Sequence, residues 1–140
     1  YSFGYSSSGF TDMPMNHKVF LAQFDAIKKL ASEGPCVMVG RCADYALSEY
    51  KDCFSVFVHA DTDWRINRLS QKHNKTAKEA KDMINKTDKS RSSYYNYYTN
   101  KKWGAASSYN LCVDSSKLGI DGAAKAIIQA IEIFDSIKNK

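Results

Sequence analysis

Apolar residues recur along the chain in two patterns, which predict helices and short strands in alternation. Between residues 15 and 32 they return at steps of three and four and stop before Gly34 and Pro35, as in an amphipathic helix. Three short apolar runs, at residues 36–39, 54–58 and 109–114, indicate buried strands. This alternation is typical of an α/β fold with a parallel sheet and right-handed crossovers.

Two further helices are predicted between the second and third strands. Asp61 or Thr62 can cap the first of them. Thr76 and Glu79 have the spacing of a capping box, which opens a longer helix that runs to about residue 98. Its second half carries charges and tyrosines with little aliphatic content, so it can cover a site without belonging to the core. Two of its four tyrosines should nevertheless pack against the sheet or a neighbouring helix.

The remaining elements are shorter or lie at the end of the chain. We expect a short helix near residues 43–49, a loop at residues 115–118 and a final amphipathic helix from Gly119 onward. No repeat or linker interrupts the pattern, and 140 residues with 44% hydrophobic content suffice for one core. The sequence therefore predicts a single domain over residues 1–140.

The net charge and the cysteines limit which partners and which cellular compartment are expected. The net charge of +5 favours an anionic partner, and the 20 basic residues include only four arginines. These arginines are Arg41, Arg65, Arg68 and Arg91. The four cysteines show no C-x-x-C pairing, which is typical of a reduced, cytoplasmic protein. No apolar run is long enough to span a membrane, so no membrane partner is expected.

The end of the first predicted strand carries the strongest candidate chemistry. Arg41 and Asp44 follow Gly40 there, and ligands bind at the carboxyl ends of strands in open α/β sheets. An arginine offers a planar fork of donors for phosphate, and an aspartate accepts hydrogen bonds from an amino group or hydroxyl. From these two residues alone, a helix-capping Asp44 and a surface Arg41 explain the pattern equally well.

A second phosphate-binding candidate lies near the start of the chain. Gly4, Gly9 and Thr11 reproduce part of the spacing of a phosphate loop. Phe10 replaces the lysine and no strand precedes the segment, so we reject it as a phosphate loop.

Several of these segments together resemble the cytidylate kinase-like family of nucleoside monophosphate kinases. They are residues 34–44, 88–99, 103–104 and 109–119. The resemblance implies a three-layer P-loop kinase fold with a helical lid at about residues 62–104. It also implies transfer of a phosphoryl group from ATP, with Mg²⁺, to CMP or dCMP. Small-molecule nucleotides are then the expected partners, and nucleic acid is not.

The resemblance also implies two sets of site residues. The catalytic set, at the start of the lid and in the charged cluster after it, is Arg65, Arg68 and Arg91. The substrate-binding set is Arg41, Asp44, Lys86 and Asp88. Phosphoryl transfer needs fixed cations more than a nucleophilic side chain, which agrees with this concentration of arginine. No side chain is assigned to the metal.

One expected segment is missing from the sequence. The family begins with a strand, a glycine-rich phosphate loop (Walker A) and a helix, and we find none of them here. We therefore expect an incomplete fold, part of a longer kinase, that is inactive by itself. The strands at residues 36–39 and 54–58 should flank an empty slot, which further chain or a second copy in a homodimer would fill. The alternatives are an inactive nucleotide-binding remnant and a basic nucleic-acid-binding module at residues 86–102.

Overall fold

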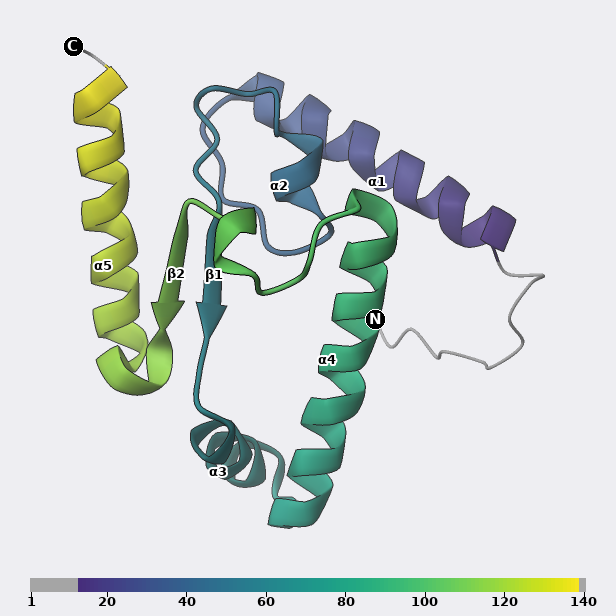
Figure 1. Ribbon diagram of the computed structural model, residues 1–140, viewed down its shortest axis with the longest axis vertical. Helices are drawn as coiled ribbons and strands as arrows, with labels where there is room; N and C mark the ends of the chain where they lie inside the picture. Colours follow the sequence, from purple (N-terminus) through teal and green to yellow (C-terminus); the bar gives the residue numbers. More distant parts are fainter. Residues whose placement is uncertain (1–12, 139–140) are drawn as a thin grey trace. The chain divides into compact units, whose positions relative to one another are not determined.

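The computed structural model describes residues 13–138, which fall into two compact units that meet between Lys51 and Asp52 in the sequence. The rejected phosphate-loop candidate, Gly4 to Thr11, lies outside the described residues. The first unit contains α1 (Met13–Glu33) and α2 (Ala43–Ala46) (Figure 1). The second contains β1 (Val56–His59), α3 (Thr62–His73), α4 (Ala77–Thr99), a 3₁₀ turn η1 (Ala106–Ser108), β2 (Leu111–Asp114) and α5 (Ser115–Lys138).

The first unit is built around the predicted amphipathic helix α1, which extends one to two residues beyond each predicted end. Phe20 and Ile27 lie two turns apart on one face and are buried. The ring of Phe24 lies 5.9 Å from that of Phe20 and 6.2 Å from that of Tyr45 in α2. The contact between Phe24 and Tyr45 holds α2, which is shorter than the predicted 43–49, against α1.

The segment at residues 36–39 is not the buried strand that its apolar run predicts. It has no regular secondary structure and belongs to no sheet, and Val37 and Val39 are 94% and 91% exposed. A strand is buried only when other strands or helices cover it, and the described residues offer this segment no ladder partner. The predicted pair of strands flanking a slot is therefore not present in the described part of the chain.

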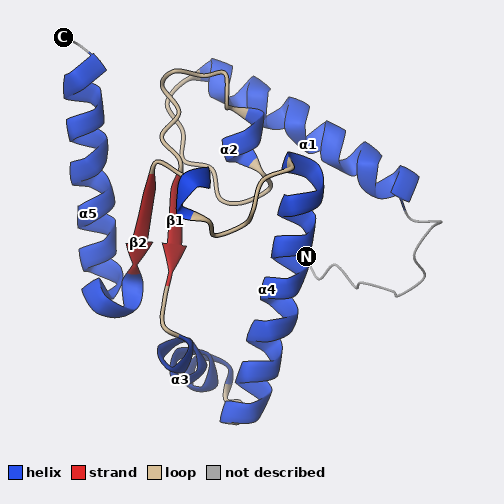
Figure 2. Ribbon diagram, in the orientation of Figure 1, coloured by secondary structure: helices blue, strands red, loops and turns tan. Residues whose placement is uncertain are grey.

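The sheet of the second unit pairs β1 with β2 in parallel (Figure 2). The register runs from Val56 opposite Leu111 to His59 opposite Asp114. Both strands lie within or next to the runs predicted at residues 54–58 and 109–114, which confirms two of the three expected strands. Parallel pairing also agrees with the crossover order predicted from the sequence.

Helix α5 covers this sheet. Ala123 is buried, and the ring of Phe134 lies 5.1 Å from that of Phe54. The loop predicted at residues 115–118 is instead a helical turn, and α5 kinks after it at Gly119, whose φ of 70° and ψ of 171° suit glycine. Lys138 forms an ion pair with Asp52, so the end of α5 is tied to the start of the same unit.

Helices α3 and α4 form a helical hairpin, in that a short turn joins them and they contact each other, and both begin at the predicted caps. The Asp61 side chain accepts hydrogen bonds from the backbone N–H groups of Asp63 and Trp64. The predicted capping box of Thr76 and Glu79 has both of its reciprocal bonds. These caps satisfy the N–H groups that the first turn of a helix leaves unpaired.

The described chain therefore has a mixed α/β architecture, with a two-stranded parallel sheet and five α-helices. This is consistent with an incomplete kinase-like fold. Among residues 13–138, every helix is too short or too polar to cross a lipid bilayer.

Candidate functional site

The α3–α4 hairpin brings two of the predicted site residues into direct contact. Arg65 Nη1 donates to Asp88 Oδ2 at 2.7 Å, and Arg65 Nη2 donates to Asp88 Oδ1 at 2.8 Å. Their side chains are 29% and 27% exposed, so solvent screens the pair only in part. The hydrogen bond to Asp88 raises the pKa of Arg65 above its usual value, which keeps this cation charged at every physiological pH.

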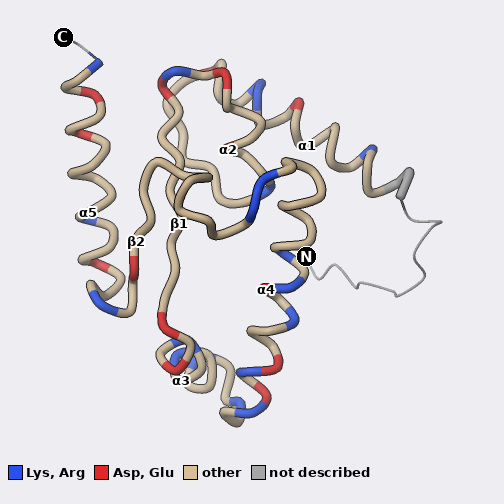
Figure 3. The backbone as a smooth tube through the Cα atoms, viewed as in Figure 1, with Lys and Arg blue, Asp and Glu red and all other residues tan. Residues whose placement is uncertain are grey.

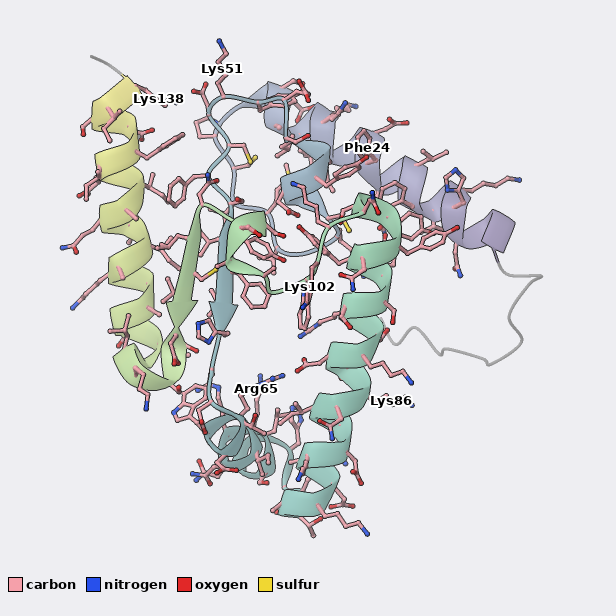
Figure 4. The ribbon with its side chains drawn as sticks, viewed as in Figure 1. Phe24, Lys51, Arg65, Lys86, Lys102 and Lys138 are labelled. Atoms are coloured by element: carbon pink, nitrogen blue, oxygen red, sulfur yellow. The ribbon has the colours of Figure 1, made fainter. Side chains whose placement is uncertain are left out.

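Three other predicted site residues lie on the same hairpin without joining this pair. The Arg68 guanidinium lies 5.4 Å from the centre of the Trp64 ring, a cation–π distance. Lys86 and Arg91 are exposed on α4, along which basic residues recur (Figures 3 and 4). The hairpin thus carries five of the seven predicted site residues, which are Arg65, Arg68, Lys86, Asp88 and Arg91.

Arg41 and Asp44 belong to the first unit: Arg41 lies in the loop that leads into α2, and Asp44 lies in the first turn of that helix. Arg41 and Cys42 both have positive φ, 57° and 56°, which is uncommon for residues other than glycine. This turn places the exposed Arg41 at the rim of a hollow of about 260 Å³. Apolar side chains of α1, among them Ile27 and Leu30, line the hollow together with residues 38–41.

Cys42, next to Arg41, is the best covered of the four cysteines. Burial raises the pKa of its thiol to about 11, and the charge of Asp44 adds to that rise. The thiol is therefore neutral and unreactive at pH 7. Cys36, by contrast, is exposed.

The carboxyl ends of β1 and β2 carry a polar network that the sequence analysis missed. Ser116 Oγ donates to the Asp114 carboxylate and accepts from the backbone N–H of Asp61. The hydrogen bond from Ser116 lowers the pKa of Asp114, and the charge of His59 contributes to the same direction. The signal in the sequence is the run of polar residues directly after the third apolar segment.

The tyrosine-rich end of α4 is largely a packing element. Tyr95 is buried and its ring lies 6.0 Å from that of Tyr109, whereas Tyr97 is mostly exposed. Phe57 of β1 contacts the rings of both Tyr109 and Trp103, at 4.9 and 5.3 Å. These aromatic contacts join the end of the hairpin to the sheet of the same unit.

The acidic side chains do not form a metal site by themselves. No group of three or more His, Cys, Asp or Glu residues in the range 13–138 is arranged to hold a metal ion. Mg²⁺ in phosphoryl-transfer sites is usually held by one or two carboxylates together with the phosphates and water. A metal that arrives with a nucleotide would need no more than one or two carboxylates of this chain.

The chain was compared with known proteins. A model of the cytidylate kinase-like family matches residues 1–117. A crystal structure of an uncharacterized protein from Eubacterium ventriosum ATCC 27560 is 33% identical, with a TM-score of 0.80. That match covers 84% of this chain and 74% of the other. The comparison with curated proteins gave no match. On the family match and this structural likeness, the chain belongs to the cytidylate kinase-like family.

Proposed function

We propose that this chain is the acceptor-site and lid portion of a nucleoside monophosphate kinase that transfers a phosphoryl group from ATP to CMP or dCMP. The observation that carries the proposal is the Arg65 guanidinium, which two hydrogen bonds to Asp88 hold in place on the α3–α4 hairpin. The chain that carries it belongs to the cytidylate kinase-like family. Residues 62–104 act as the lid. A phosphate loop from another part of the longer kinase completes the site.

The residues of the hairpin hold and neutralise the phosphates. Arg65, Arg68 and Arg91 donate to phosphoryl oxygens, where an arginine can hold two oxygens at once through its planar fork. Lys86 adds a flexible charge at the rim of the lid. Bound ATP supplies the phosphoryl group, and its Mg²⁺ neutralises charge on the phosphates.

The acceptor nucleotide is bound by the first unit. Arg41 donates to the monophosphate, and Asp44 accepts from an amino group or hydroxyl of the nucleotide. The positive φ of Arg41 supports this role, because strained backbone concentrates at binding and catalytic sites.

Kinetics of the full-length natural protein test the role of the hairpin. With ATP, Mg²⁺ and CMP, we expect Arg65→Ala to lower kcat by a factor of ~10³, the scale of an arginine that meets the transferring group. Lys78→Ala is the matched control, because Lys78 is an exposed cation on α4 outside the proposed site. Equal rates for the Arg65→Ala variant and the natural protein would contradict the proposal.

A further inference from the structure

The hydrogen bonds between Arg65 and Asp88 leave part of the guanidinium available. A guanidinium has five N–H donors in one plane. Asp88 accepts from Nη1 and Nη2, so it occupies the end of the fork that lies furthest from the chain. The Nε–H and the N–H beside it on the adjacent Nη form a second pair of parallel donors along the side of the guanidinium. That side edge matches the spacing of two phosphoryl oxygens.

The same bonds fix where this side edge points. An unpaired arginine side chain samples many rotamers, and ordering it on binding costs free energy. Here both terminal nitrogens of Arg65 are anchored to α4 by a residue 23 positions later in the chain. With 29% of its side chain exposed, Arg65 is held in place and still reaches solvent.

We propose that Asp88 is a positioning residue: it orients Arg65 so that the side edge of the guanidinium receives a phosphoryl group, and it does not itself bind nucleotide. This inference rests on the proposed function, and it gives Asp88 a different role from the substrate binding that the sequence resemblance implied. Both carboxylate oxygens of Asp88 already accept from Arg65, which supports the revised role.

Simple electrostatics and the positioning role predict opposite effects on anion binding when the Asp88 charge is removed. Asp88→Asn deletes a negative charge beside an anion-binding cation, which by Coulomb's law strengthens anion binding. Orientation by Asp88 predicts weaker binding, because the loosened guanidinium must be ordered again for each phosphate. The sign of the change in anion affinity therefore shows whether Asp88 positions Arg65 or only opposes anion binding through its negative charge.

The test titrates the full chain with inorganic tripolyphosphate and follows the Arg65 Nε–H resonance by NMR. We expect this resonance to shift in the natural protein and the affinity of Asp88→Asn to fall by about tenfold, the scale of one charge-assisted hydrogen bond. Asp82→Asn is the matched control, because Asp82 is an exposed carboxylate of the same helix. It should leave the affinity unchanged or slightly raised. Equal or tighter binding by Asp88→Asn overturns the proposal.

Repeating the Asp88→Asn replacement in a chain that lacks the Arg65 guanidinium tests whether Asp88 has a purely structural role. In an Arg65→Lys chain the fork is gone, so adding Asp88→Asn should no longer weaken tripolyphosphate binding. The same tenfold loss in that background would show that Asp88 acts through the fold or binds the anion directly, and would overturn the proposal.

The tripolyphosphate-binding test does not depend on whether the protein transfers a phosphoryl group. If tripolyphosphate binding follows Asp88 as expected while the full-length protein transfers no phosphoryl group, the positioning role holds and the kinase function fails. If transfer occurs but Asp88→Asn binds tripolyphosphate more tightly, the kinase function holds and the positioning role fails.

Discussion

Replacing Arg41 by alanine and, separately, by glycine tests whether the loop after residue 40 holds its arginine in strained backbone. Arg41 has a φ of 57°, next to a φ of 56° at Cys42. Both replacements remove every contact of the arginine side chain. The difference between the two variants therefore reports the backbone alone.

The expected difference follows from two opposing contributions. A left-handed conformation costs a residue with a Cβ about 1–2 kcal/mol, and glycine escapes that cost. Glycine loses about 0.5–1 kcal/mol more than alanine on folding, because its unfolded chain is freer. We therefore expect Arg41→Gly to be more stable than Arg41→Ala by about 0.5–1 kcal/mol.

Urea unfolding measures this difference, with Ala22→Gly as the control. Ala22 is exposed within α1, where replacing alanine by glycine should cost about 1 kcal/mol. The two alanine-to-glycine comparisons should thus have opposite signs. If Arg41→Gly is less stable than Arg41→Ala by the amount seen at Ala22, the backbone at Arg41 is not strained and the reasoning is refuted.

The same two variants test the acceptor site. In the full-length protein, both should bind the nucleoside monophosphate about 2 kcal/mol more weakly, because a charge-assisted bidentate contact is lost. The affinity for ATP should barely change. Calorimetric titration that shows equal losses for both nucleotides, or none for either, would place Arg41 outside the acceptor site.

Three further predictions concern the fold. In the native protein a neutral disulfide reagent at pH 8 should modify the exposed Cys36 and leave Cys42, whose thiol pKa burial raises to about 11; equal rates would contradict this. The backbone N–H of the N-cap lowers the pKa of Glu79, so its stabilisation is present above its unfolded pKa and is lost as the pH falls through the lower folded pKa; urea unfolding at several acid pH values should show this loss in the natural protein and not in Glu79→Gln. Gly104→Ala should lower stability by about 2 kcal/mol in thermal unfolding, because φ is 74° and the new Cβ would lie 3.2 Å from the Phe57 ring; an unchanged Tm would refute that contact.

Local signals in the sequence predicted the helices well. The apolar period marked α1, and the capping box of Thr76 and Glu79 placed the start of α4. Both signals act within one or two turns of helix, where sequence neighbours are also neighbours in space. The pattern at residues 54–58 and 109–114 likewise predicted β1 and β2, since each strand is short and rich in apolar residues.

Features that depend on distant segments were predicted less well. The run at residues 36–39 has the composition of a buried strand, but its burial depends on partners that the run itself does not specify. The resemblance named both Arg65 and Asp88 as site residues, yet only the folded hairpin shows that they bind each other. The helical turn before Gly119 was missed because a single glycine favours either a loop or a kink.

Transfer of labelled phosphate tests the central claim most directly. The full-length protein would be mixed with ATP labelled on its γ-phosphoryl group, Mg²⁺ and CMP, with AMP in place of CMP as the comparison. The account predicts that the label appears in CDP in a one-to-one ratio with ADP and at a much lower rate in the AMP reaction. Label that stays on ATP, or is released only as inorganic phosphate, would contradict it.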